Sequence, residues 1–331
     1  MINVSIGLIG AALQTDKDTP ATAPTFTHGL TGGKVANLER SIESASVSCG
    51  VRAGTDSYVA SIASGLDFDA YCYADVLPLY LYGCLGAIAS KASAKDGLFE
   101  HTVTLGDSLP YLTFWGRIGS EYTRTDGCKV DQIEMEFEGN KPVSFGVTAI
   151  GMATTLGLAS IPGAGDPSCF DGYFVPTNGT FKLDTASDTA TDAPVISGAL
   201  TLANSCSTAP LAGQISPGSV DEGKLTSSGN VKVRPDDLSL YKAMITGSPT
   251  GTVPTGKIVY GSFEWEFTHS KNADYKMTVK ATHVPFTAEF PEVSPDGGSA
   301  EIQFDFADIG IDSRGGSPVE ITVTNATESY I

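Results

Sequence analysis

Residues 132–138 read Gln-Ile-Glu-Met-Glu-Phe-Glu, a strict alternation of polar and apolar side chains. Because successive side chains of a β-strand point to opposite faces of the sheet, this alternation predicts a strand with one packed face and one polar face. The polar face of this strand carries Glu134, Glu136 and Glu138. The sequence around it therefore predicts a sheet protein with a core on one side and a row of carboxylates on the other.

The same pattern occurs at two other places in the chain. Residues 263–267 read Phe-Glu-Trp-Glu-Phe, and Asp67 and Asp69 alternate with apolar residues in a shorter version. One interpretation is an ordinary strand that faces solvent. The other is an acidic face that lines a channel and must stay hydrated, because like charges on paired strands repel one another. The candidate channel-facing residues are Asp67, Asp69, Glu134, Glu136, Glu138, Glu264 and Glu266.

Alternation and turn residues elsewhere predict a chain built mainly of strands. Residues 11–35, rich in Thr, Pro, Ala and Gly, are expected to form an extended arm, and residues 163–192 are expected to form a loop. Gly139 and Asn140 supply a turn between two strands. Strands are predicted near 42–52, 58–73, 100–105, 111–117, 127–138, 142–151, 194–203, 227–234, 257–268, 274–282, 299–307 and 318–325.

Two short helices interrupt the strands. The first is predicted between Asp75, a potential N-cap, and Gly86, a typical residue for ending a helix. Pro78 would fall within its first turn, where a missing N–H is tolerated. The second helix is predicted from Pro235 to Ile245.

The two halves of the chain share sequence features around these helices. Residues 75–80 (Asp-Val-Leu-Pro-Leu-Tyr) resemble residues 236–241 (Asp-Asp-Leu-Ser-Leu-Tyr), and the offset of 236 − 75 = 161 equals that of the two following glycines, 247 − 86 = 161. Residues 133–137 likewise resemble residues 263–267, at an offset of 130. An extra segment near residues 93–125 would explain the change of offset. We interpret the pattern as an internal duplication, with chance similarity as the alternative.

Composition limits the function classes. The chain has 331 residues and a formal charge of 20 − 38 = −18, without the clustered Lys and Arg that tight nucleic-acid binding requires. Six cysteines occur without C-x-x-C spacing, which argues against zinc or thioredoxin-type sites. Without an evident export signal, reduced thiols in a cytoplasm are the expectation. The apolar runs are too short to cross a bilayer, so no membrane insertion is predicted.

Catalytic and ligand-binding motifs are not evident. The four histidines are scattered, and residues 29–34 lack the spacing of a phosphate loop. Asp305, Asp308 and Asp312 do not fit an EF-hand and are expected to lie at a solvated strand end. We therefore predict no enzyme activity, no cofactor and no metal site.

The order of these features resembles that of the tail tube proteins of siphoviruses, over most of the chain. The motifs that carry this resemblance are packing and turn motifs. They are residues 19–22 in the arm, 77–86 around the first helix, 101–113, 127–133, 142–151, 195–204 and 318–325.

The resemblance implies a mainly β fold with two tandem sandwich or barrel units, each with a short flanking helix, that join neighbouring subunits in a closed inner β-barrel. We expect an extended N-terminal arm at 1–35, a first unit at 36–165 and a second at 166–331. Rings would stack into a hollow tube for DNA ejection. A family ring commonly has six units, so three duplicated chains would close one ring with pseudo-sixfold symmetry, and a hexamer is the alternative.

The resemblance also implies partners and a location. The expected partners are further copies of the chain, the tape measure protein, the tail terminator and distal tail proteins, and genomic DNA in transit without sequence-specific binding. The expected location is the virion tail, assembled in the cytoplasm of the host bacterium. A tail-surface or host-adhesion β-module is the alternative function.

Overall fold

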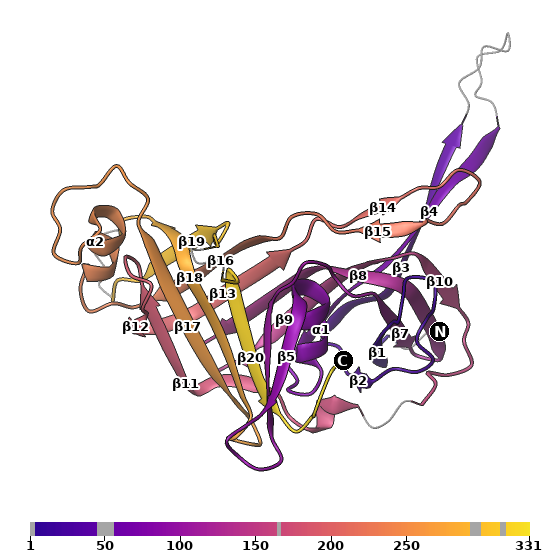
Figure 1. The fold of residues 1–331 in the computed structure, drawn as a ribbon, viewed down its shortest axis with the longest axis horizontal. Helices are drawn as coiled ribbons and strands as arrows, with labels where there is room; N and C mark the ends of the chain where they lie inside the picture. Colours follow the sequence, from indigo (N-terminus) through magenta and orange to yellow (C-terminus); the bar gives the residue numbers. More distant parts are fainter. Residues whose placement is uncertain (1–3, 45–55, 164–166, 292–298, 312–315) are drawn as a thin grey trace, which may run out of the picture.

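The computed structural model describes residues 4–44, 56–163, 167–291, 299–311 and 316–331. Strands dominate this part of the chain, and all pairings between them are antiparallel, which confirms the predicted mainly β class. The body consists of three connected sheets, with a small helix at one end and a projecting pair of hairpins at the other (Figure 1). No sheet closes into a barrel within the described residues of one chain.

The eight-stranded sheet combines strands from both halves of the sequence. Strand β4 pairs with β9, β9 pairs with β8, and β8 pairs with β13. Strands from the first half of the sequence are therefore hydrogen-bonded directly to strands from the second half. Its strands in spatial order are β3 (Gly32–Ser44), β4 (Ser57–Tyr71), β9 (Ser144–Gly151), β8 (Glu121–Glu138), β13 (Val195–Ala203), β16 (Thr226–Val233), β19 (Ile302–Ala307) and the last residues of β18 (Lys276–Ala288).

The seven-stranded sheet lies face to face with it. Strand β18 belongs to both sheets, because residues 276–285 pair here and residues 286–288 pair with β19. In order, this sheet contains β5 (Gly86–Ala92), β6 (Phe99–Leu105), β20 (Val319–Asn325), β18, β17 (Tyr260–His269), β11 (Phe174–Asp184) and β12 (Thr191–Asp192).

A five-stranded sheet extends the body at the other end. It uses the first half of the long strand β8, whose second half continues into the eight-stranded sheet. Its strands are β2 (Phe26–His28), β1 (Gly7–Leu13), β7 (Leu112–Ile118), β8 and β10 (Ala153–Leu156). The segment expected as an arm thus contributes β1 and β2 to the chain's own sheet, with Ile9 and Ala11 buried.

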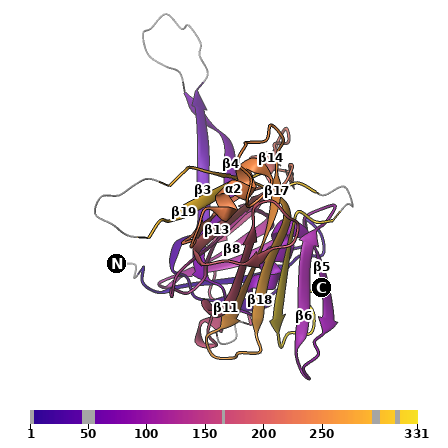
Figure 2. The same ribbon diagram turned by 90° about the vertical axis from the view of Figure 1, so that its left-hand side faces the viewer.

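Two hairpins project from the body. Strands β3 and β4 form the longer one, and β14 (Ser207–Ala209) with β15 (Ser219–Asp221) forms the shorter one. The two lie side by side in Figures 1 and 2, and the backbone N–H of Ile62 donates to the carbonyl of Ile215 at 3.0 Å. Residues 45–55, which include part of the strand expected at 42–52, lie outside the described residues.

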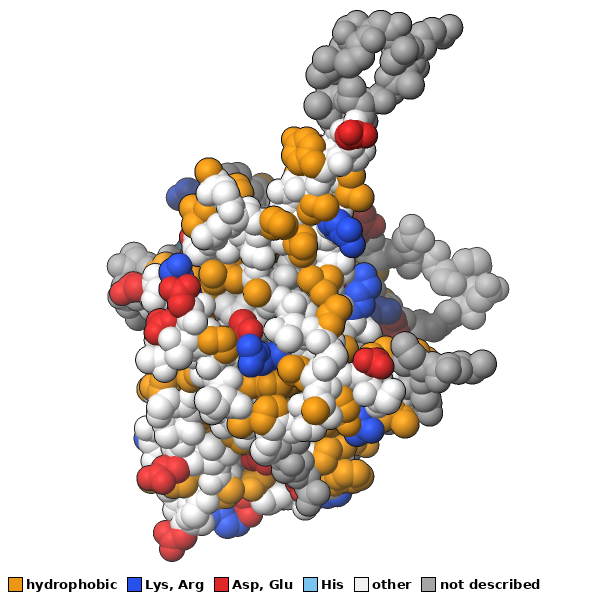
Figure 3. All heavy atoms as spheres, turned by 90° about the vertical axis from the view of Figure 1, so that its right-hand side faces the viewer, with side chains coloured by type: hydrophobic (Ala, Val, Ile, Leu, Met, Phe, Trp, Pro, Cys, Tyr) orange, Lys and Arg blue, Asp and Glu red, His pale blue; other side chains and the backbone are white. Residues whose placement is uncertain are grey.

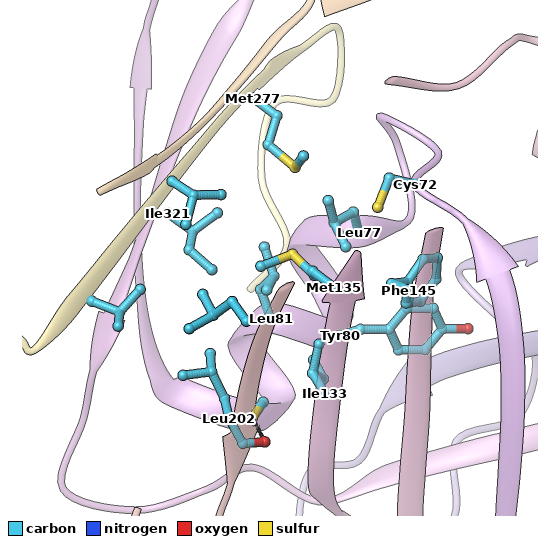
Figure 4. Packing of buried hydrophobic residues seen from close by; sticks show 14 of the residues in the cluster. Cys72, Leu77, Tyr80, Leu81, Ile133, Met135, Phe145, Leu202, Met277 and Ile321 are labelled. Carbon is cyan, nitrogen blue, oxygen red and sulfur yellow. Dashed lines mark hydrogen bonds between the residues drawn. The ribbon is translucent and has the colours of Figure 1, made fainter. Parts of the chain in front are cut away.

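The core fills the space between the two large sheets. Inward side chains of β8 contact those of β17, and Phe263 of β17 contacts Phe306 of β19 at 5.4 Å between ring centroids. Helix α1 (Leu77–Leu85) closes one end of this core, and Figure 4 shows Tyr80 and Leu81 among side chains of both sheets. One buried cluster extends from Ile9 to Tyr330, so both halves share a single core.

Helix α1 confirms the first predicted helix. Pro78 lies in its first turn, and Gly86 ends it with a φ of 88°, a left-handed conformation that glycine adopts without strain. The predicted cap by Asp75 is wrong, because the N-cap position is Val76 and no side chain caps the helix. Helix α2 (Ser239–Thr246) begins four residues after the predicted start at Pro235, and a short 3-10 helix spans Ser168–Phe170.

The expected loop at residues 163–192 is wrong for residues 174–184 and 191–192, which form β11 and β12. Strand β11 contains a register shift between Val175 and Thr180, where Asn178 has a φ of 64°. This irregularity interrupts the alternation of buried side chains, which is the signal that identifies a strand from sequence. Strands β1 and β5 were also not predicted.

The two resembling segments do not occupy parallel positions in this fold. Residues 133–137 lie in the eight-stranded sheet and residues 263–267 in the seven-stranded sheet, where they face each other across the core. Strand β20 at the end of the chain pairs with β6 of the first half. The halves therefore share both sheets, and a division between residues 165 and 166 stays a prediction.

Candidate functional site

The outward side of the eight-stranded sheet is the candidate functional surface, and we call it the acidic face. The inward side of the same strands carries Phe68, Val147 and Ile133, all fully or almost fully buried. Because side chains alternate along a strand, the residues between them point away from the core. Five of the predicted acidic residues lie on this outward side: Asp67, Asp69, Glu134, Glu136 and Glu138.

The acidic residues of β4 and β8 meet across strand β9. Gly146 pairs with Asp69 on one side and with Glu134 on the other, and a Cβ at Gly146 would lie 3.0 Å from Asp69 Oδ1. The absence of a side chain there leaves room for the two carboxylates. Partial burial raises the pKa of Glu134, and the neighbouring charges of Glu136 and Asp69 raise it further. The cluster thus holds negative charge at a cost, as like charges do.

The rest of the acidic face is small and polar. On β13 and β16 it continues through Ala199, Thr201 and Asn230, and it reaches Asp305 on β19. The strand positions on this face hold seven carboxylates, the five above with Glu39 on β3 and Asp305 on β19, against the two lysines Lys34 and Lys232. The balance is 2 − 7 = −5, so this side of the sheet repels anions such as phosphate.

The other two predicted residues lie on the opposite side of the molecule. Glu264 and Glu266 are on β17, and they point outward from the seven-stranded sheet. Each is neutralised by a lysine: Lys182 Nζ lies 2.6 Å from Glu264, and Lys276 Nζ lies 2.8 Å from Glu266. The two acidic sets therefore face away from each other. In the first, Glu138 pairs with Lys141, and the other four carboxylates have no ion-pair partner within the described residues.

The histidines serve the fold. In the buried His28, Nδ1 donates to the Gly29 carbonyl at 2.9 Å, so the neutral ring's Nε2 accepts from the Tyr80 hydroxyl at 2.8 Å. In His101, Nε2 donates to the side-chain oxygen of Asn325 at 3.1 Å. Burial lowers the pKa of both rings. Within the described residues, no group of three His, Cys, Asp or Glu side chains is arranged to hold a metal ion.

Asp305, Lys232 and Gly146 were not predicted to lie on the acidic face. Asp305 was expected at a solvated strand end, and only the pairing of β19 with β16 places it beside Asn230 on this sheet. Gly146 lacks any side chain whose chemistry would identify it. For Asp305, the alternation of Gln303, Asp305 and Ala307 with buried residues is the sequence signal that would have placed its side chain on the outward side of a strand.

Comparison of the sequence with known protein families shows which family the chain belongs to. A family model described as phage tail tube protein matches residues 3–324, which is nearly the whole chain. The chain belongs to the phage tail tube protein family. No curated protein matches it at a significant level.

Membership in this family identifies a structural protein of the virion tail, which assembles with further copies of itself into a tube. This confirms the predicted family and the main function. None of the helices in the described part of the chain is long and apolar enough to span a membrane.

Proposed function

We propose that the acidic face lines the lumen of the tail tube of a long-tailed, siphovirus-type phage, and that genomic DNA slides past it during ejection. The observation that supports this most strongly is the contrast between the two outward faces. On the acidic face Asp67, Asp69, Glu134 and Glu136 have no ion-pair partner within the described residues, and Glu138 alone of the five pairs, with Lys141. The carboxylates of Glu264 and Glu266 are each bound by lysine. A wall on which carboxylates outnumber lysines repels phosphate, so DNA would have few ion pairs to break as it moves.

The eight-stranded sheet also suggests how many chains form a ring. Its two edges are β3 and the end of β18, and neither has a further strand partner within the described residues. Joining these edges between neighbouring chains would close a barrel and remove both edges. Three chains would supply 3 × 8 = 24 strands. At a spacing of about 4.8 Å and a tilt of about 40°, the backbone diameter is about 50 Å.

The lumen of such a barrel is wide enough for duplex DNA. After side chains on both walls are subtracted, about 40 Å remains, which admits duplex DNA of about 20 Å with a layer of water. Six chains with the same sheet would give about 100 Å, far wider than DNA requires. A trimeric ring with pseudo-sixfold symmetry is therefore our proposal, and it agrees with the proposed duplication into units at 36–165 and 166–331.

Further partners follow from this role. A tube open at both ends needs a distal tail complex and a terminator, and a tape measure protein would occupy the lumen before DNA does. Assembly would take place in the host cytoplasm. In this role the chain acts without catalysis, and its buried histidines act as structural residues.

End-on electron microscopy of the purified chain tests the proposal. Rings or hollow tubes with threefold averages and a lumen of about 40 Å would support it. Sixfold averages would replace the trimer by the hexamer. A compact particle without a central channel would contradict the tube role of the acidic face and would favour a tail-surface or host-adhesion β-module.

A further inference from the structure

One end of the eight-stranded sheet carries an apolar surface around helix α2, which we call the α2 edge. It consists of Tyr241, Phe290 and the loop 247–259 with Val253 and Ile258. Phe290 lies two residues beyond the end of β18, the edge strand, and its ring meets Tyr241 edge-on at 5.3 Å. Val253, Ile258 and Phe290 are 74%, 70% and 61% exposed.

Helix α2 is less deeply buried than α1, although its apolar side chains Leu240, Tyr241 and Ile245 pack against the chain's own core. In α1, eight of nine residues are buried, including Tyr80. In α2 only Ala243 and Met244 are buried, and Tyr241, which corresponds to Tyr80 at the offset of 161, is half-buried. Apolar side chains gathered at an exposed position typically mark a contact surface. In this chain the surface lies directly beside an unpaired strand edge.

The opposite end of the same sheet has a matching hollow, which we call the β3 groove. It has a volume of about 710 Å³ and lies beside β3, the other unpaired edge. Its wall includes the apolar residues Leu30, Val35, Ile118, Tyr122 and Leu156 and the charged residues Lys34, Arg117 and Glu121. Figure 3 shows apolar side chains gathered over this end of the molecule, below the projecting hairpin. Leu156 is 61% exposed at its rim.

We propose that the β3 groove of one chain receives the α2 edge of a second copy of this chain, which makes the lateral contact of the ring. This rests on the proposed ring. The occupant is a second copy because each apolar surface adjoins one of the two free edges of a single sheet. Pairing β3 with the end of β18 of the next chain would bring the surfaces together. The two surfaces lie at opposite ends of one chain (Figure 1), so the contact joins two different surfaces and is heterologous. Repeated from chain to chain, such a contact forms a closed ring when the successive rotations add up to a full turn.

Two variants, each with one damaged end, test this contact. The first carries Val253→Asp and Ile258→Asp in the α2 edge, and the second carries Leu156→Asp in the groove. All three side chains are exposed in the single chain, so the fold should persist, as circular dichroism would verify. A carboxylate forced into an apolar contact should weaken association about tenfold or more. The control is Ile331→Asp, which is 76% exposed at the C-terminus.

Native mass spectrometry of the separate and mixed variants gives the outcome. Each variant alone should remain monomeric where wild type and the control form rings or tubes. A 1:1 mixture should form heterodimers and nothing larger, because one intact α2 edge then meets one intact groove. Wild-type-like rings from either variant, or a mixture without heterodimers, would overturn the inference while leaving the tube role intact. A wild-type chain that never assembles would contradict the proposed ring itself, and this inference with it.

Discussion

The ring of Phe137 packs against the indole of Trp265 with 5.0 Å between centroids and 68° between the ring planes. Phe137 belongs to the eight-stranded sheet and Trp265 to the seven-stranded sheet, so this contact joins the two layers. Phe267 and Phe181 also contact Phe137, each at 5.1 Å. The two resembling sequence segments thus hold the sandwich together by facing each other.

We expect Phe137→Ala to lower the free energy of unfolding by about 3–5 kcal/mol, because it leaves a cavity among three aromatic rings. Urea unfolding of the unassembled chain would measure the loss. The matched control is Glu136→Gln, the next residue on the same strand, whose side chain points outward and should change stability by less than about 0.5 kcal/mol. Equal effects of the two substitutions would show that β8 does not face the core as described.

Stability should fall on acidification because of His28. Burial lowers the pKa of this fully buried ring to about 4, against 6.5 for an exposed histidine. Between these values the unfolded chain binds a proton that the folded chain excludes. Stability is therefore fully present above pH 6.5 and is lost as the pH falls toward 4. The loss attributable to His28 is about 3 kcal/mol at most.

Unfolding measured from pH 7.5 to pH 4 in wild type and His28→Gln would check this. The variant should be less stable at pH 7.5, since it alters the bond to Tyr80, but its stability should decline less steeply below pH 6.5. Parallel curves for the two proteins would contradict the assignment.

DNA ejection should depend on the acidic face. We expect virions with Glu134→Lys and Glu136→Lys to eject DNA severalfold more slowly at low salt, because lysines in the lumen would bind passing phosphate. The effect should weaken as ionic strength rises. Release of DNA from purified virions, followed by a fluorescent dye, measures the rate.

The matched control exchanges charges on the other sheet. Lys182→Glu combined with Glu264→Lys preserves the local ion pair and should leave the ejection rate unchanged. If the control virions ejected DNA slowly and the acidic-face variants ejected it at the wild-type rate, the seven-stranded sheet would line the lumen instead.

The ion pair between the buried Lys129 and the half-buried Glu222, under the shorter hairpin, should be costly to break by changing Glu222 alone. Lys129, 7% exposed, is paired with Glu222, and its Nζ lies 4.7 Å from the centre of the Tyr111 ring. Glu222→Gln should cost about 1–3 kcal/mol, because it leaves a buried cation without its counter-charge.

The double variant Lys129→Met with Glu222→Gln should recover part of that loss, since it removes the buried charge as well. Urea unfolding of the single and double variants gives the coupling between the two residues. Strictly additive losses would mean that the pair contributes nothing as a pair.

The sequence by itself determined the local structure that rests on periodicity. Alternation identified β8, β9 and β17, and Pro78 with Gly86 placed helix α1, because these signals arise within one strand or one helical turn. It also separated the carboxylates of Glu134 and Glu136 from the apolar side of their strand. It failed at β11, where a register shift between Val175 and Thr180 breaks the alternation.

Only the tertiary structure decided which acidic residues share a surface. Glu134 and Glu264 have the same sequence pattern, yet one lies beside Asp69 and the other against Lys182. Strand order and register set these neighbours, and they depend on pairings between residues far apart in the chain, such as β8 with β13 and β6 with β20. Alternation shows which side of a strand is polar, but it carries no information about which sheet the strand joins.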